Sequence, residues 1–235
     1  MDRAEAEMTQ RFSAHPALQD VRPVGDLHDI LLERRHLSLM FTQVYDMLLD
    51  GVEDAKAKGV IRDIIREEYP RLGVNDGRSH REDVVVDMIA TGLNRVEIVT
   101  HRPSVATAAV IAETLDFVFE LLSSPKRSLL AVSFIRMWGE VLTALEYERL
   151  WYAGIGRFFK RTQDSVFYWY HFEHDRSRHG FVRNYADEPR GAATHSDQLT
   201  RCLAQIVRTE ADADEVLRVD MRACSLKQHF YDQFD

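Results

Sequence analysis

The chain contains long segments with a helical hydrophobic period and few residues that would interrupt them. In "LHDILLERRHLSLMFTQVYDMLL", apolar residues recur every three or four positions, which places them on one face of an α-helix. Only 11 glycines and 6 prolines occur among the 235 residues, and most of them lie between such segments. We find no convincing β-strand in the sequence. The sequence therefore predicts an all-α fold.

Helix-ending and helix-starting residues divide the chain into seven or eight expected helices. The helix expected at 52–69 ends before Pro70, because proline cannot continue the hydrogen-bond ladder. Ser79, followed by Glu82 three residues later, forms a capping-box pattern at the start of a helix at 80–93. No internal repeat or linker divides the chain, which predicts one domain. The other expected helices cover residues 26–50, 104–122, 128–160 (with a kink near Gly139 or Gly154), 164–183, 196–208 and 212–234.

The composition excludes several classes of protein. Hydrophobic residues make up 45% of the chain and charged residues 29%, which is typical of a globular protein and too apolar for disorder. The net charge of −8 and the lack of a basic run argue against a nucleic-acid-binding protein. The most apolar segment, "SLLAVSFIRMWGEVLTAL", is interrupted by Arg136 and Glu140, which argues against a membrane span.

The cysteines and the N-terminal residues indicate the cellular compartment. Cys202 and Cys224 are far apart and form no CxxC pair, so we expect two free thiols in a reducing environment. The start, "MDRAEAEMTQRF", contains acids and no apolar core, unlike a secretory signal. We therefore expect a cytoplasmic protein.

The segment "YWYHFEHDRSRHGFV" places His171, Asp175 and His179 at intervals of four residues. Four residues advance a helix by about 400°, so the three side chains face nearly the same direction. Imidazole and carboxylate groups bind iron, manganese and zinc. Such a row is also compatible with a solvated helix face, or with hydrogen-bonded core histidines. The aromatic residues before the row, and the charged Glu173 and Arg176 on the opposite face, favour metal ligands.

A site with two metal ions needs further donors, and acids in apolar helical segments are the best candidates. A buried carboxylate is costly unless it is paired or bound to a metal. Glu67 or Glu68 ends the second expected helix, and His80 begins the third. Glu146 follows an apolar run, with Glu140 and Glu148 nearby. Each of these acids taken alone would more often be a surface residue.

The order of these residues resembles that of the haem-oxygenase-like di-iron oxidases and oxygenases. The shared order is a glutamate, a histidine near the start of the third helix, a glutamate within "ALE", and H-x-x-x-D-x-x-x-H. The resemblance extends from "RRHLSLMFTQVYDMLL" to "QHFYDQFD", nearly the whole chain. It implies a haem-oxygenase-like helical bundle over residues 1–235 and a non-haem enzyme in which two Fe(II) ions activate O₂. The implied reaction is oxidation of a small amine or amino-acid-like substrate, by N-oxygenation or oxidative C–C or C–N chemistry, in natural-product biosynthesis.

The resemblance also implies a set of metal ligands. Asp175 and His179 would bind chiefly the second iron ion. The ligands of the first would be Glu68, His80, Glu146 and His171. The twelve positions between Glu68 and His80 are more than the family pattern leads us to expect, so Glu67 is an alternative ligand. A further carboxylate from an early helix would be Glu33 or Asp46.

Substrate and partner expectations follow from the same region. Trp138, Tyr147 and Tyr170 would line a pocket beside the metal ions, although such aromatic residues more often serve in core packing. Arg136 would bind an anionic or amino-acid-like substrate, or would pair with Glu140 across one helical turn. The partners expected are a small-molecule substrate, with an external electron donor and a homodimer both compatible with the resemblance, and neither nucleic acid nor membrane.

Three other functions compete with this interpretation. One is a metal-independent enzyme on the same fold, such as a thiamine-salvage-like hydrolase or a cofactorless oxidase. The hydrolase would need a catalytic cysteine, whereas Cys202 and Cys224 lie in the last two expected helices. Another is a non-catalytic helical protein that acts through partner contacts. The third is a hydrolase with a single zinc ion, for which the additional glutamates and His80 would be surplus.

Overall fold

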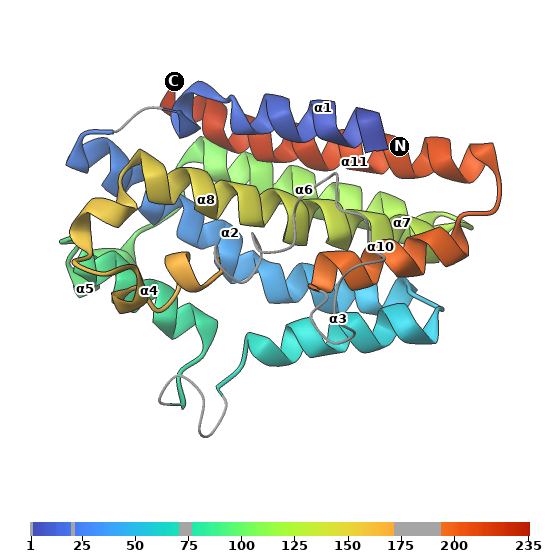
Figure 1. The fold of residues 1–235 in the computed structure, drawn as a ribbon, viewed down its shortest axis with the longest axis horizontal. Helices are drawn as coiled ribbons and strands as arrows, with labels where there is room; N and C mark the ends of the chain where they lie inside the picture. The colour runs from blue at the N-terminus through green and yellow to red at the C-terminus, as the bar shows by residue number, and fades with distance from the viewer. Residues whose placement is uncertain (1, 20–21, 71–76, 172–193) are drawn as a thin grey trace.

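The computed structural model describes residues 2–19, 22–70, 77–171 and 194–235, and these are α-helical without a β-strand (Figure 1). This confirms the predicted all-α class. Short 3₁₀ helices are η1 (Pro16–Leu18), η4 (Ile155–Phe158), η5 (Thr162–Asp164) and η6 (Asp232–Phe234). The longer elements are α1 (Asp2–Ser13), α2 (Val24–Gly51), α3 (Ala55–Glu67), α4 (His80–Ala90), α5 (Arg95–Thr100), α6 (Val105–Ser123), α7 (Arg127–Phe134), the π-helix η3 (Ile135–Val141), α8 (Leu142–Ala153), α10 (His195–Ile206) and α11 (Glu210–Tyr231).

Most of the expected helices occur close to their predicted positions. The capping box at the start of α4 is formed, because Ser79 and Glu82 each bind the other's backbone N–H. The helical period did not reveal α1 and α5. Helix α1 has a polar sequence, and α5 has only 6 residues, so neither shows a long apolar period. Of the helix expected at 164–183, residues 168–171 are helical, and residues 172–183 lie outside the described part of the chain.

A continuous helix at the centre of the bundle consists of α7, η3 and α8. It contacts α1, α2, α6, α10 and α11, and so it touches most sides of the core. The expected kink at Gly139 is a π-helical segment, and the helix ends at Ala153 before Gly154. Arg127–Ala153 is long and apolar enough to cross a membrane, but 78% of its apolar window is buried inside the bundle. This burial is what a core helix requires.

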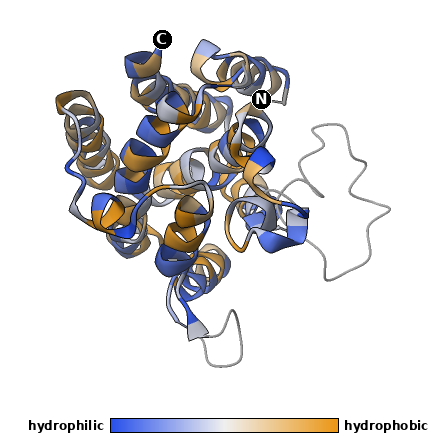
Figure 2. Ribbon diagram, turned by 90° about the vertical axis from the view of Figure 1, so that its left-hand side faces the viewer, coloured by the Kyte–Doolittle hydropathy of each residue, from blue (hydrophilic) through white to orange (hydrophobic). Residues whose placement is uncertain are grey.

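The side chains of α2 explain both the core and the site beside it. Hydrophobic and hydrophilic residues alternate along the helices (Figure 2). Leu27, Leu31 and Val44 are fully buried, as the helical period predicts. Two charged residues of the same helix, Glu33 and Arg34, are also buried. Because buried charges need partners, α2 must meet polar side chains inside the bundle.

Candidate functional site

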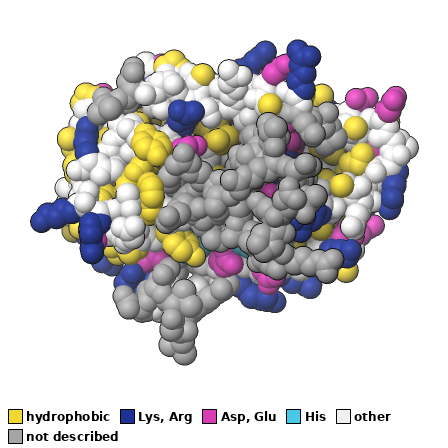
Figure 3. All heavy atoms as spheres, viewed as in Figure 1, with side chains coloured by type: hydrophobic (Ala, Val, Ile, Leu, Met, Phe, Trp, Pro, Cys, Tyr) yellow, Lys and Arg dark blue, Asp and Glu magenta, His cyan; other side chains and the backbone are white. Residues whose placement is uncertain are grey.

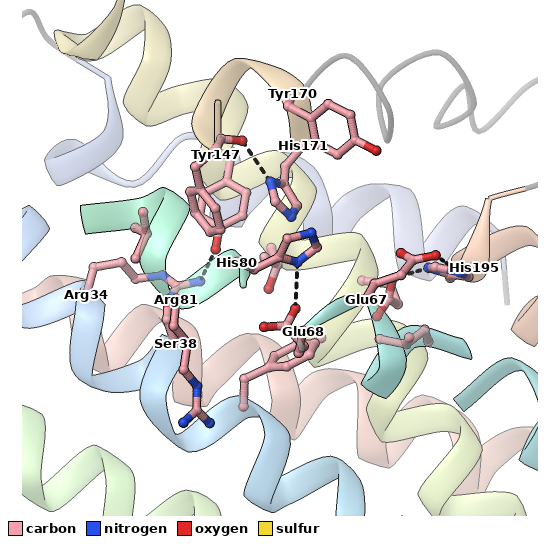
Figure 4. A pocket seen from close by; sticks show the side chains of 17 residues that line it. Arg34, Ser38, Glu67, Glu68, His80, Arg81, Tyr147, Tyr170, His171 and His195 are labelled. Carbon is pink, nitrogen blue, oxygen red and sulfur yellow. Dashed lines mark hydrogen bonds and ion pairs between the residues drawn. The ribbon is translucent and has the colours of Figure 1, made fainter. Parts of the chain in front are cut away.

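A cavity of about 80 Å³ lies between α2, α3, α4 and η3, close to the start of α10 (Figure 4). Acidic side chains and histidine are also visible near the centre of the face in Figure 3. The cavity combines carboxylates and imidazoles with cationic and aromatic groups. It is lined by Arg34, Ser38, Phe41, Ile64, Glu67, Glu68, His80, Arg81, Val84, Gly139, Glu140, Thr143, Tyr147, Phe167, Tyr170, His171 and His195.

Glu68, His80 and His171 lie together in this cavity, although they come from three separate parts of the chain. His80 Nδ1 is 3.0 Å from Glu68 Oε1. The rings of His80 and His171 meet edge to face, with centroids 4.7 Å apart. Burial opposes protonation of His80, but the neighbouring carboxylates of Glu68, Glu67 and Asp83 raise its pKa above the ordinary value. The predicted association of these three residues is thus present in the structure.

Backbone contacts fix the position and the tautomer of His171. Its Nδ1 is 2.7 Å from the carbonyl oxygen of Phe167, and Nδ1–H therefore donates to that oxygen. Nε2 is then the acceptor nitrogen of the ring. Histidine ligands of metals are usually oriented by such a hydrogen bond from the other ring nitrogen.

Asp87, on α4, anchors the segment that carries His171. Its carboxylate accepts hydrogen bonds from Ser165 Oγ at 2.6 Å and from the backbone N–H groups of Val166, Phe167 and Tyr168 at 3.0 Å each. Burial raises the pKa of Asp87, and these hydrogen bonds partly counteract the effect. The N–H groups of Val166, Phe167 and Tyr168 precede or begin the helical residues 168–171 and have no partner within that helix. The Asp87 carboxylate accepts from them and so acts as an N-cap.

The π-helix η3 carries Glu140 into the cavity. Tyr45, fully buried on α2, donates a hydrogen bond from its hydroxyl to Glu140 Oε1 at 2.5 Å. This contact depends on Gly139, because a Cβ at that position would overlap the Tyr45 hydroxyl. π-Helical turns occur often at functional sites, where the inserted residue redirects a side chain. Here the π-helical turn directs the Glu140 carboxylate into the cavity, and the hydrogen bond from Tyr45 of α2 fixes its position.

His195, the first residue of α10, lies between two carboxylates of the cavity. Its Nε2 is 3.7 Å from Glu67 Oε1, and its Nδ1 is 3.9 Å from Glu140 Oε2. Helix α10 packs against both α3 and η3, which brings these groups together. Glu67 and Glu68 therefore both face the cavity, Glu67 towards His195 and Glu68 towards His80 (Figure 4).

Glu146, predicted as a metal ligand, binds cationic side chains instead. It is fully buried and is not among the residues that line the cavity. Arg34 Nε donates to it at 2.6 Å, Lys227 Nζ donates at 2.8 Å, and the Tyr231 hydroxyl donates as well. Burial opposes its charge, but Arg34 and Lys227 lower its pKa well below the ordinary value. A metal ion could bind this carboxylate only by displacing a guanidinium and an ammonium group.

The alternative carboxylate ligands are also placed elsewhere. Glu33 accepts two hydrogen bonds from the backbone N–H of Ser104, at 3.1 and 3.0 Å, and lies 3.5 Å from His101 Nε2. Asp46 is exposed on α2. Neither of these two described side chains lines the cavity. Asp175 and His179, the remaining predicted ligands, lie outside the described residues.

Two of the four predicted substrate-binding residues line the cavity, Tyr147 and Tyr170. Arg136 is instead bound to Glu5 at 2.6 Å and to Thr200 Oγ1 at 2.6 Å, in another part of the bundle. Trp138 is buried, with its ring 5.5 Å from that of Phe134. Their roles in the described structure are ion pairing and core packing.

Sequence reasoning missed His195 and gave Glu140 only as a neighbour of Glu146. Glu140 did carry a signal, since it is an acid within the most apolar segment of the chain. His195 carried no such signal, because no other candidate ligand lies one helical turn away from it in the sequence. Within the described residues, the one group of three donors with ligand atoms within 4.8 Å of one another lies elsewhere, at His15, Asp232 and Asp235.

Comparisons with known proteins support the fold. No protein-family model matches the sequence, and no curated protein is significantly similar to it. Solved structures are similar over 99% of this chain. One is a domain of unknown function with a haem-oxygenase-like fold from Shewanella denitrificans OS217 (TM-score 0.67, 15% identity, 89% of that chain covered).

Two further similar structures come from other bacteria. A CADD-like protein of unknown function from Nostoc punctiforme PCC 73102 has a TM-score of 0.64 and 13% identity, with 95% of that chain covered. A TenA homologue from Pseudomonas syringae pv. tomato str. DC3000 has a TM-score of 0.63 and 12% identity, with 89% of that chain covered. At these identities the similarity concerns the fold alone, and the chain has a haem-oxygenase-like fold.

Proposed function

We propose that this protein is a non-haem di-iron oxidase or oxygenase that uses O₂ to oxidise a small amine or amino-acid-like molecule. The observation that carries the proposal is the cavity in which carboxylates and imidazoles from separate helices face one another. Carboxylate oxygens and imidazole nitrogens are the donors that iron ions accept in oxygenase sites. The proposed ligands are Glu68, His80, Glu140 and His171, with Glu67 as a further carboxylate and Asp175 and His179 retained from the sequence.

The donor set fits such ions in its chemistry and in its supporting contacts. Bound iron would supply the electrons and the coordination positions with which O₂ is activated. The Phe167 carbonyl orients His171, and Glu68 orients His80. Tyr45 holds Glu140 from the opposite side. Supports of this kind raise metal affinity because they keep ligands in position before the ion arrives.

The other lining residues provide a partly apolar environment for a small substrate. Phe41, Phe167 and Tyr147 border the same cavity as the donors. A volume of about 80 Å³ holds only a few water-sized groups, which favours a small substrate or one end of a longer molecule.

Iron binding and O₂ consumption test the proposal. Anaerobic titration with Fe(II), followed by metal analysis, should give about two ions per chain in the wild type. His171→Ala and Glu140→Gln should lose iron while far-UV circular dichroism stays helical. His229→Ala is the matched control, because this histidine is exposed on α11 and lies outside the cavity.

O₂ uptake by the iron-loaded protein should rise with one member of a panel of amines, amino acids and fatty acids. Unchanged iron content in both cavity variants would refute the proposed ligands. A wild type that binds no iron would refute the function itself.

A metal-independent enzyme on the same fold is the second candidate, because one similar structure is a TenA homologue. In that case the carboxylates and imidazoles of the cavity would act as acid–base groups. Neither Cys202 nor Cys224 is among the described residues that line the cavity, so a cysteine nucleophile has no support there. Turnover of a thiamine-like substrate by metal-free protein would favour this candidate over the first.

A further inference from the structure

The wall of the cavity formed by Arg34, Ser38 and Tyr147 is rich in hydrogen-bond donors (Figure 4). Arg34 Nη1 donates to Ser38 Oγ at 2.9 Å, and Nη2 donates to the Tyr147 hydroxyl at 3.3 Å. Both hydroxyl groups accept from the guanidinium. The Ser38 O–H also hydrogen-bonds the Tyr147 hydroxyl, whose own O–H is left to donate into the cavity. Among the described residues, the acids that line the cavity are engaged elsewhere, since Glu67, Glu68 and Glu140 are joined to imidazoles or to Tyr45.

Arg34 has donor capacity beyond these contacts. A guanidinium has five N–H groups. Three of them are used within the described residues, by Glu146, Ser38 and Tyr147. Two N–H groups remain on a side chain that is only 5% exposed. A buried donor without a partner is costly, so a ligand that accepts from these groups would be stabilised.

The charges behind this wall leave an excess of one positive charge. Arg34 and Lys227 both bind the single carboxylate of Glu146, and all three side chains are almost completely buried. The tyrosines around them are neutral, because burial raises the pKa of Tyr231 well above its ordinary value and that of Tyr147 to about 12. A buried cation without a full counter-charge attracts an anion.

The geometry points to a carboxylate-binding subsite at Arg34, Ser38 and Tyr147, which holds the acid group of a small organic acid or amino acid. A planar carboxylate matches the fork of a guanidinium, and its single charge equals the excess on this wall. A phosphate dianion would exceed that charge. His80 and His171 lie across the cavity from Arg34 in Figure 4, so the rest of the molecule would extend towards the proposed metal ligands.

This subsite replaces the predicted one at Arg136, which is occupied by Glu5 and Thr200. The subsite rests on the proposed function in one respect, namely that the end of the molecule away from the carboxylate is the end that reacts. The carboxylate contacts themselves need no metal ion.

Binding of butanoate, compared with butanamide, tests the subsite. The two probes have nearly the same size, and only butanoate is charged. Affinities are measured by NMR titration of the protein, without metal and again with Fe(II) under anaerobic conditions. We expect the wild type to prefer butanoate by about tenfold, the ratio that one hydrogen-bonded charge supplies.

Four variants test which side chains hold the carboxylate. Ser38→Ala and Tyr147→Phe each remove one hydroxyl and should lower the preference at least about threefold. Arg34→Lys keeps the charge beside Glu146 but loses the fork, and should lower the preference at least as much as either hydroxyl variant. Arg136→Lys is the matched control for altering a buried arginine, and should behave as the wild type.

The binding measurements distinguish failure of the carboxylate subsite from failure of the proposed function. Equal affinities for butanoate and butanamide, or a preference that Ser38→Ala, Tyr147→Phe and Arg34→Lys leave unchanged, would overturn the subsite. A preference that appears only with Fe(II) and survives in these variants would mean that the carboxylate binds the metal, which overturns the subsite and supports the proposed function. A preference without metal, in a protein that binds no iron, would leave the subsite standing and refute the proposed function.

Discussion

Replacing Glu146 by glutamine separates a buried ion pair from a metal ligand. The carboxylate is fully buried and binds Arg34, Lys227 and Tyr231. Removing one partner of a buried ion pair typically costs about 3–5 kcal/mol, because the remaining charge is buried without compensation. For a chain of this length each kcal/mol corresponds to about 2–4 °C, so we expect Tm to fall by about 6–20 °C.

The pH dependence of this loss follows from Lys227. Burial lowers its pKa to about 8, although Glu146 counteracts the effect. In Glu146→Gln that support is absent and the lysine loses its proton more readily. A neutral Lys227 carries no uncompensated charge, so the variant should recover part of its stability as the pH rises from 7 to 9. Thermal unfolding followed by circular dichroism at the two pH values measures both effects.

Metal titration completes the test. Glu146→Gln should bind Fe(II) with the stoichiometry of the wild type at temperatures where it is folded, whereas Glu140→Gln should lose iron with a smaller change in Tm. The reasoning would be refuted if Glu146→Gln lost iron and kept its stability, because its carboxylate would then act as a ligand.

Three further predictions concern Tyr45, Gly139 and Asp220. Tyr45→Phe should weaken Fe(II) binding about 10- to 100-fold by calorimetry, because Glu140 loses the hydroxyl that holds it; unchanged affinity would contradict this role. Gly139→Ala should lower the free energy of unfolding in urea by about 1–3 kcal/mol or more, because the methyl group overlaps the Tyr45 hydroxyl, and a neutral effect would argue against that contact. Burial raises the pKa of Asp220 from 3.8 to about 7, so the folded state holds a proton that the unfolded state has lost and stability falls as pH rises from 4 to 7. The loss is about 4 kcal/mol in the wild type and should be absent in Asp220→Asn, and equal pH slopes in urea titrations would show that Asp220 does not titrate in this way.

The helical period predicted the positions of the main helices because each buries a continuous apolar face. The resemblance to the haem-oxygenase-like di-iron oxidases, and not the helical period, implied that Glu68, His80 and His171 would lie together, as they do in the cavity. Neither the helical period nor the resemblance predicted that Glu140 lines the cavity and that Glu146 does not. These acids are six residues apart and point to different sides of the helix, and only the packing of α2, α10 and α11 decides which side faces the cavity.

The position of Arg136 outside the cavity was not predictable for a related reason. Arg34 and Arg136 both lie in apolar helical segments, and the sequence does not reveal their partners. Glu5 comes from α1, a helix that the apolar period did not reveal, and it is the residue that pairs with Arg136. Because α1 was not predicted, the pairing of Arg136 with Glu5 could not be predicted either.

The π-helix also affects which changes of length the chain can tolerate. A π-turn equals an α-helix with one additional residue, so deleting a residue within 135–141 would restore regular α-helical geometry. Because a π-turn takes up its additional residue locally, the residues beyond the deletion would keep nearly the same direction around the helix axis. The change would therefore be confined to the turn, where Gly139 and Glu140 would take new directions. A shortened chain could keep the pairing of Glu146 with Lys227 and still lose the carboxylate that faces the cavity.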